Sequence, residues 1–248
     1  MTAPSHSKTP NQERQRLDRF LSQSGRLSRS MARKAILAGE VTINGTLCRD
    51  ASTKIGPNDT VHHHHDIVVA PSHHYLMLHK PEGVVCATED GRHRTVIDLL
   101  GEPWRSDLHI AGRLDIDTTG LVLLTSDGDW SHRVTSPRHN KAKRYHVTTA
   151  DPIASSWCAS FEQGVMLDGE TKLTRPAQLE ILDEFHANLC LQEGRYHQVK
   201  RMFAAMGTRV VKLHRYAIGE LILDNTLPLG HYRALTDCEI QRLADHSA

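Results

Sequence analysis

One short segment, residues 111–126, carries side chains that could do chemistry at the entrance to an apolar run. Its charged residues and the glycines around them are Gly112, Arg113, Asp115, Asp117 and Gly120. The uninterrupted run Leu121–Leu124 is typical of a strand that is buried on both faces. Glycine allows backbone angles that other residues resist, so the segment before the strand is predicted to be a loop. Its charged side chains would then be held at a rigid strand end.

Three interpretations of this loop remain open on spacing alone. Asp115, Asp117 and Thr119 resemble the start of a calcium-binding loop, but the twelfth position is Ser126, which cannot supply the bidentate carboxylate. Paired carboxylates also serve glycoside hydrolysis, yet two residues this close on one loop rarely face each other across a sugar. The third interpretation is a polar turn whose carboxylates accept hydrogen bonds from backbone amides.

The whole segment 112–121, Gly-Arg-Leu-Asp-Ile-Asp-Thr-Thr-Gly-Leu, resembles the catalytic motif of the RsuA family of RNA pseudouridine synthases. Residues 78–83 and 193–203 resemble two further blocks of that family, and residues 130–139 are similar to its members that act on the small ribosomal subunit. The resemblance covers nearly everything after residue 14. One departure is His79, where the family usually has Asn before Lys-Pro.

The resemblance implies roles for individual residues. Asp115 matches the essential nucleophile, and Lys200 takes the place of the basic residue that pairs with it. Tyr145 matches the tyrosine whose ring packs beneath the target base; without the family, a tyrosine sharing a strand face with Val147 would be read as core. Arg113 is expected to fill the space of a flipped-out uridine or to hold phosphate.

The implied activity is conversion of a uridine in 16S ribosomal RNA, within a partly assembled small subunit, to pseudouridine. This chemistry requires no cofactor and no metal, and the sequence has no P-loop or dinucleotide glycine pattern. Two alternatives stay open at this point. One is the same reaction on a large-subunit uridine, and the other is a non-catalytic S4-type RNA-binding or ribosome-assembly factor.

The same family match implies an α+β protein with an S4-type domain and a catalytic domain built on a mixed, mainly antiparallel sheet. We predict a disordered leader over residues 1–15, an S4-like RNA-binding domain over 16–70 and a catalytic domain over 71–248. In the first domain, Leu17, Phe20 and Leu21 have helical spacing. A second helix is predicted from the cap Ser28 to Ala38, with Met31, Ala35 and Ile36 facing inward. Asn-Gly at 44–45 predicts a hairpin turn.

Basic residues gather where RNA contact is expected. Residues 1–60 hold ten Lys and Arg residues against five Asp and Glu residues, so this part carries +5 and the remainder −4 of the total +1. The helix after Ser28 has no acid between its basic residues, which favours a phosphate-binding face. The predicted RNA-binding residues are Arg26, Arg29, Arg33, Lys34, Lys80, Arg113, Arg138, Arg195, His197 and Arg201. His197, Lys200 and Arg201 form a cationic edge beside the apolar stripe of a helix predicted around Val199–Met206.

Histidines at positions 62–65 and Asp66 have the side-chain types that bind zinc. Consecutive residues of a strand point to opposite faces, so they are not expected to reach one ion together. We therefore predict no metal site, and interpret residues 62–74 as the end of the first domain and a linker.

Composition is ordinary for a globular protein, with 39% hydrophobic and 24% charged residues. No apolar run approaches the roughly 20 residues that span a bilayer, and the first residues lack the apolar centre of a signal peptide. The five cysteines are scattered and never form a Cys-x-x-Cys pair. We expect a cytoplasmic monomer with reduced thiols.

Overall fold

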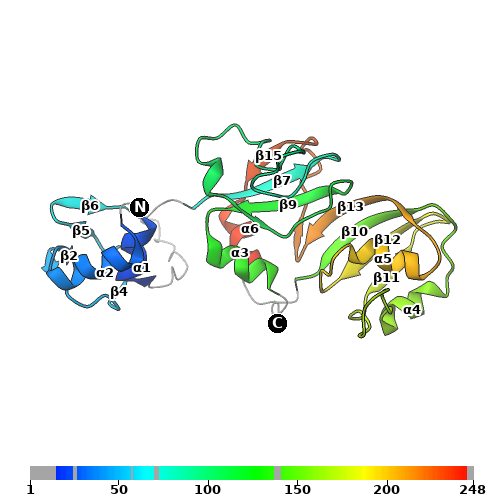
Figure 1. Ribbon diagram of the computed structural model, residues 1–248, viewed down its shortest axis with the longest axis horizontal. Helices are drawn as coiled ribbons and strands as arrows, with labels where there is room; N and C mark the ends of the chain where they lie inside the picture. The colour runs from blue at the N-terminus through cyan, green and yellow to red at the C-terminus, as the bar shows by residue number, and fades with distance from the viewer. Residues whose placement is uncertain (1–14, 25–26, 57, 70–72, 137–140, 245–248) are drawn as a thin grey trace, which may run out of the picture. The chain divides into compact units, whose positions relative to one another are not determined.

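The computed structural model describes residues 15–24, 27–56, 58–69, 73–136 and 141–244 (Figure 1). The predicted leader, apart from Gln15, and the predicted RNA-binding residues Arg26 and Arg138 lie outside these ranges. The chain divides into an N-terminal unit, residues 1–72, and a C-terminal unit, residues 73–248. Within the described ranges, no helix has the length and apolar character that crossing a bilayer requires.

The N-terminal unit contains the helices α1, Leu17–Gln23, and α2, Arg29–Ala38. Ser28 caps α2 by accepting a hydrogen bond from the Met31 amide, and Gly39 ends the helix in the left-handed conformation, so the predicted helix is confirmed. Met31 itself is 53% exposed, and its predicted inward position is wrong. Ala35 and Ile36 are buried, as predicted, and Ala32 is the third buried residue of the helix.

Short strands complete the N-terminal unit. They are β1, Gln15–Arg16; β2, Val41–Ile43; β3, Thr46–Leu47; β4, Lys54–Ile55; β5, Val61–His63; and β6, Asp66–Val68. One sheet has the order β3-β2-β5-β6, and β1 pairs with β4. Asn44 and Gly45 both have positive φ, 52° and 79°, which confirms the predicted hairpin turn.

Residues 61–68 of the histidine-rich stretch form a second hairpin of this sheet, near the end of the N-terminal unit. Strand β5 ends at His63, and His64 lies in the turn with φ of 55°, the left-handed region. The alternation of side chains along a strand therefore does not extend to His64. The prediction that these histidines point to opposite faces therefore does not apply to the pair His63 and His64.

The C-terminal unit is built on a mixed sheet. Its strands are β7, Tyr75–Lys80; β8, His109–Ala111; β9, Thr119–Thr125; β10, Lys143–Thr149; β11, Gln178–Ile181; β12, His186–Leu191; β13, Val210–Ile218; β14, Leu221–Ile222; and β15, Tyr232–Ala234. The order is β11-β12-β10-β13-β9-β7-β15, with β8 beside β9 and β14 beside β13. Among the described strands, only β13 and β9 pair in parallel, so the predicted mixed, mainly antiparallel sheet is confirmed.

Helices cover both faces of this sheet. They are the 3-10 helix Arg105–Asp107 and the helices α3, Gly128–Thr135; α4, Trp157–Gln163; α5, Gln198–Ala205; and α6, Asp237–Ala244. The run Leu121–Leu124 of β9 is fully buried, as predicted. Its odd-numbered residues pack with Trp130 of α3, and its even-numbered residues belong to the core that includes Phe203 of α5. Helices α3 and α6 lie together beside β9 (Figure 1).

Candidate active site

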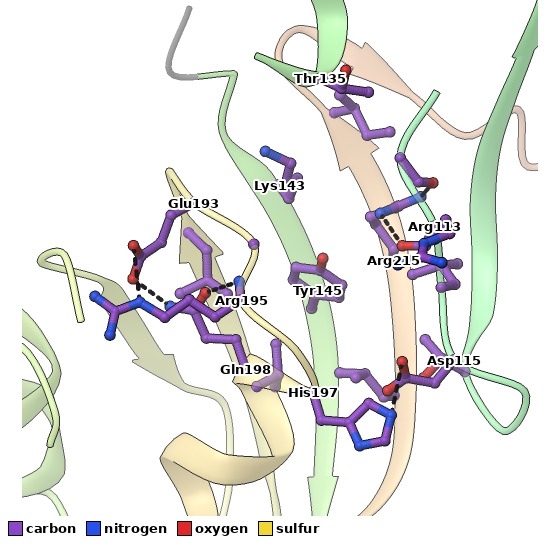
Figure 2. Close-up of a pocket in the computed structure, with 18 of the residues that line it drawn as sticks. Arg113, Asp115, Thr135, Lys143, Tyr145, Glu193, Arg195, His197, Gln198 and Arg215 are labelled. Atoms are coloured by element: carbon purple, nitrogen blue, oxygen red, sulfur yellow. Dashed lines mark hydrogen bonds and ion pairs between the residues drawn. The ribbon is translucent and has the colours of Figure 1, made fainter. Parts of the chain in front are cut away.

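A pocket of about 290 Å³ opens where the loop between β8 and β9 faces β10, β13 and the start of α5. Asp115 of that loop and Tyr145 of β10 both line it (Figure 2). The Asp115 side chain is 28% exposed and contacts His197 and Lys200 of the opposite wall. One oxygen lies 3.1 Å from Lys200 Nζ, and the other lies 3.4 Å from His197 Nε2. The structure thus brings Asp115 against His197 and Lys200, which lie far from it in the sequence.

Lys200 is shared between two carboxylates. Its Nζ donates to Asp117 Oδ1 at 2.5 Å as well as contacting Asp115. Burial acts to raise the pKa of Asp117, but the hydrogen bond and charge of Lys200 outweigh it, and the pKa lies below its ordinary value. Burial likewise acts to lower the pKa of Lys200, and the two carboxylates reverse that effect and raise it. At neutral pH the ammonium therefore stays charged between the two carboxylates.

His197 reaches the pocket because of its backbone. It precedes α5 with φ of 46°, in the left-handed region, and its ring stacks on Tyr196 at a centroid distance of 3.8 Å. This conformation turns its Nε2 toward Asp115 (Figure 2). Of the predicted cationic edge, His197 and Lys200 therefore face the loop, whereas Arg201 turns to other partners.

Tyr145 lies in the middle of β10, between Leu189 of β12 and Arg215 of β13. Its side chain is 8% exposed and belongs to the main core while also lining the pocket. A flat ring is thus presented at the pocket wall by a strand that is paired on both sides. Lys143, on the same wall, has its pKa lowered by burial and by the charge of Arg215.

Arg215 of β13 binds the backbone of the Asp115 loop, and it is not among the residues predicted from the sequence. Its side chain is 2% exposed, and its guanidinium donates to three carbonyl oxygens. Nη2 donates to Gly112 at 2.8 Å, Nη1 to Arg113 at 3.3 Å and Nε to Leu121 at 2.9 Å. An arginine in a strand of mostly apolar residues could have suggested a buried structural role. The carbonyl groups that it binds are not predictable from local spacing.

Lys80 is a second anchor of the loop, and its burial contradicts the predicted contact with RNA. The side chain is fully buried, with no exposed area, and donates to three carbonyl oxygens. The Nζ distances are 3.1 Å to Pro81, 3.3 Å to Ile116 and 2.7 Å to Thr118. Burial lowers the pKa of Lys80. A buried cation that is satisfied by loop carbonyls fixes the backbone around Asp115 rather than binding substrate.

Gly120 allows the close parallel approach of β9 and β13. Its φ is 114°, and a Cβ built there would lie 2.2 Å from the carbonyl oxygen of Arg215. Only a residue without a side chain fits such a contact. Gly120 therefore lies both at the end of the loop and at the contact between β9 and Arg215 of β13.

Two of the predicted RNA contacts, Arg195 and Arg201, are held by Glu170, which is not among the residues predicted from the sequence. Arg201 Nη1 donates to its carboxylate at 2.7 Å, and Arg195 forms an ion pair with the same carboxylate. These hydrogen bonds, that of Arg201 first, lower the pKa of Glu170. Arg195 also donates to Glu193 at 3.3 Å. Arg195 thus ties the segment before α5, and Arg201 the helix itself, to the loop that carries Glu170, which positions His197 and Lys200.

In the N-terminal unit, the basic face of α2 is less free than its sequence suggests. Asp18 of α1 is fully buried, and Arg16, Arg29 and Arg33 approach its carboxylate at 3.0, 3.7 and 2.9 Å. The hydrogen bond from Arg16, followed by that from Arg33, holds the pKa of Asp18 well below its ordinary value. The guanidinium groups of α2 nevertheless remain more than half exposed, and Lys34 is exposed beside them.

Comparison with known proteins places this geometry in context. Residues 74–205 match the family described as RNA pseudouridylate synthase, and residues 15–61 match the S4 domain. Ribosomal small subunit pseudouridine synthase A of Haemophilus influenzae is 48% identical over 229 residues, which cover 92% of this chain and 99% of that protein. The protein of the same name from Escherichia coli is 48% identical and covers 91% and 98%, respectively.

A solved structure is also similar. A crystal structure of a pseudouridylate synthase superposes with a TM-score of 0.68 at 47% sequence identity. The superposition covers 92% of this chain and 99% of the solved one. The similarity therefore extends over both units of the chain.

Proposed function

The chain belongs to the RNA pseudouridylate synthase family, and we propose that it converts a uridine of 16S ribosomal RNA to pseudouridine with Asp115 as the nucleophile. The reaction breaks the bond between ribose C1′ and uracil N1 and joins C1′ to C5. N1 gains a proton and C5 loses one, so the reaction is an isomerisation. It transfers no electrons and calls for no redox cofactor.

One observation carries the proposal: the carboxylate of Asp115, which lines the pocket, is held against Lys200 at 3.1 Å. A buried carboxylate without a partner would favour its neutral and unreactive form, and an adjacent ammonium opposes this. Lys80 and Arg215 hold the loop backbone on either side of Asp115, so its oxygens do not have to be ordered when substrate binds. The arrangement supports a preformed nucleophile at the mouth of a small pocket.

The remaining pocket residues support the binding of a single extruded base. A uridine inside an RNA helix cannot be reached, so it must flip out before reaction. Tyr145 offers the face of its ring at the pocket wall, where a flat uracil can stack. Arg113 is exposed on the loop and can contact phosphate or fill the vacated space.

The choice of ribosomal RNA rests on the relatives and on the N-terminal unit. The relatives from two bacteria carry the small ribosomal subunit in their names, and this chain matches nearly their full length. The exposed cations Arg29, Arg33 and Lys34 of α2 can contact phosphates and orient the RNA without reading bases. We further propose that the protein acts in the cytoplasm, as a monomer, on a partly assembled subunit.

The nucleophile is tested by Asp115→Asn, with Asp117→Asn as the matched control. Release of tritium from RNA labelled at uridine C5 measures the reaction, because that proton is lost. We expect Asp115→Asn to lower the rate by more than about 1,000-fold, with RNA affinity within about threefold of wild type. Asp117→Asn keeps the contact between Asp115 and Lys200 and should stay within about tenfold. Retained turnover in Asp115→Asn would show that Asp115 is not the nucleophile.

The substrate is tested separately, in cells. Ribosomal RNA from cells lacking the gene is treated with carbodiimide, which marks pseudouridine, and is then sequenced. Loss of one modified position from 16S RNA supports the proposal. Loss of a modified position from the large-subunit RNA would instead show that the enzyme acts on that RNA.

A further inference from the structure

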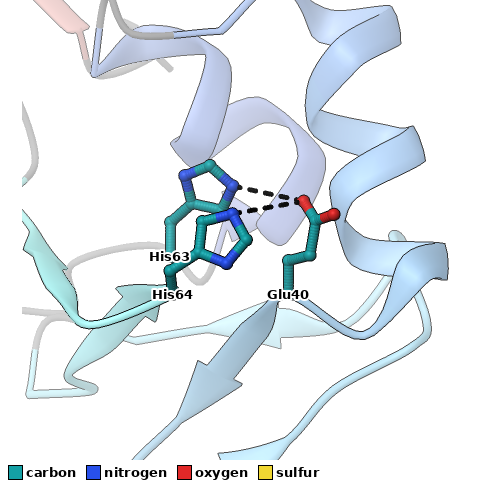
Figure 3. A group of neighbouring side chains, drawn as sticks. All are labelled: Glu40, His63 and His64. Atoms are coloured by element: carbon teal, nitrogen blue, oxygen red, sulfur yellow. Dashed lines mark ion pairs between the residues drawn. The ribbon is translucent and has the colours of Figure 1, made fainter.

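The hairpin β5–β6 of the N-terminal unit brings two histidines onto one carboxylate. Glu40 Oε2 lies 3.5 Å from His63 Nε2 and 3.6 Å from His64 Nε2 (Figure 3). One possible metal-binding atom from each of the three residues lies within 4.8 Å of the other two. These residues have no part in the pocket that contains Asp115.

The backbone, rather than flexible side chains, sets this convergence. Val41, which follows Glu40, pairs with His63, and the His64 amide donates to the Glu40 carbonyl at 2.8 Å. His64 has φ of 55°, so its ring turns to the same side as that of His63. The two ring centroids are 4.5 Å apart. The three side chains are therefore anchored at adjoining positions of one sheet.

The spacing fits a divalent transition metal. Zinc binds imidazole nitrogen and carboxylate oxygen at about 2.0–2.2 Å, so tetrahedral ligands lie about 3.3–3.6 Å apart. The two nitrogen–oxygen separations in this cluster are 3.5 and 3.6 Å. Two histidines and one carboxylate form a common set of zinc ligands that leaves one position for water.

A second observation points to a missing partner. His63 Nε2 is buried, with less than 1 Å² of exposed area, and forms no hydrogen bond. Buried polar nitrogens are rarely left in this state. The side chains of His64 and Glu40 are 60% and 39% exposed, so an ion from solvent can reach the cluster.

We propose that Glu40, His63 and His64 form a mononuclear zinc site that joins the start of β2 to the turn between β5 and β6. Zinc bound there stabilises the folded N-terminal unit by mass action, because the unfolded chain does not hold the three ligands together. The site is independent of the reaction proposed for the C-terminal unit.

The test is titration of the chelator-treated full-length chain with Zn²⁺ by calorimetry. The expected result is one Zn²⁺ per chain with a micromolar dissociation constant. Glu40→Gln and His64→Ala, each of which alters an exposed ligand, should weaken this binding at least tenfold. His65→Ala removes a neighbouring exposed histidine outside the cluster and should bind like wild type. Equal weakening by His65→Ala, or full binding by Glu40→Gln, overturns the site.

Two further measurements guard against misfolded variants. Hydrogen exchange of residues 61–68 should slow when Zn²⁺ is added to the wild type and should not change in Glu40→Gln. Co²⁺ bound in place of Zn²⁺ should give the visible absorption bands of a low-symmetry, four- or five-coordinate site. Unchanged exchange in the wild type, or the weak spectrum of hydrated Co²⁺ alone, contradicts the proposal.

Discussion

Replacing Lys80 with methionine tests whether this residue anchors the Asp115 loop or contacts RNA. The side chain has no exposed area and donates to the carbonyls of Pro81, Ile116 and Thr118, the last two in the Asp115 loop. Methionine keeps the length of the side chain and removes both the charge and the donors. We therefore expect Lys80→Met to loosen the loop and to leave RNA binding unchanged.

The size of the effect follows from these contacts. Hydrogen bonds to charged groups contribute about 1.5–3 kcal/mol each, and three carbonyls lose theirs. Removing a buried ammonium returns several kcal/mol of desolvation cost, which leaves a net loss of about 2–4 kcal/mol in the free energy of unfolding. Displacement of a reacting group by about 1 Å can lower a rate by about 100-fold. We expect a loss of turnover of that order.

The sequence supplies a selective probe for this measurement. All three tryptophans, Trp104, Trp130 and Trp157, belong to the C-terminal unit, so tryptophan emission in urea follows the unfolding of that unit. Lys212→Met, at an exposed position of β13, is the matched control and should change the free energy of unfolding by less than about 0.5 kcal/mol. RNA affinity is measured at several salt concentrations by fluorescence anisotropy.

Two outcomes would refute the reasoning about Lys80. One is a free energy of unfolding within about 0.5 kcal/mol of wild type, because three unpaired carbonyls cannot be neutral. The other is a drop of about 0.7 in the log–log salt slope of binding to single-stranded RNA, which is the loss of one phosphate contact. The second outcome would show that Lys80 contacts RNA, as the sequence predicted.

Three other predictions follow from single contacts. Gly120→Ala would place a Cβ 2.2 Å from the Arg215 carbonyl oxygen, so urea unfolding should show a loss above about 3 kcal/mol, unlike Gly101→Ala, which has open space around it. Burial lowers the pKa of His214 from 6.5 to about 4, so between these values the unfolded chain binds a proton that the folded chain does not. Stability should therefore fall as pH falls from 6.5 to 4, and less steeply in His214→Asn; equal slopes would contradict this. Lys34→Ala should reduce the salt slope of RNA binding by about 0.7, and an unchanged slope would exclude a phosphate contact.

Local features could be read from the sequence because neighbouring residues determine them. The cap at Ser28, the Asn44–Gly45 turn and the buried run Leu121–Leu124 depend on contacts within a few positions or on composition alone. The motif resemblance added the family and drew attention to Asp115, Tyr145 and Lys200. The side chains of these residues line one pocket in the folded chain.

The tertiary structure decided which charges bind each other. Asp18 lies under the basic face of α2, although no acid is close to that face along the helix itself. Glu170 holds both Arg195 and Arg201, which the sequence suggested were available to RNA. In both cases the partner comes from another element, so residue spacing carries no signal of it.

The sequence alone determined that a charged, glycine-bounded loop precedes a buried strand, because periodicity and glycine content are local properties. It could not determine what holds that loop. The Arg215 guanidinium and the Gly112 carbonyl are 103 positions apart, and Lys80 and the Thr118 carbonyl are 38 apart. A buried cation needs acceptors within about 3 Å. Only the folding of distant strands into one sheet brings those acceptors to it.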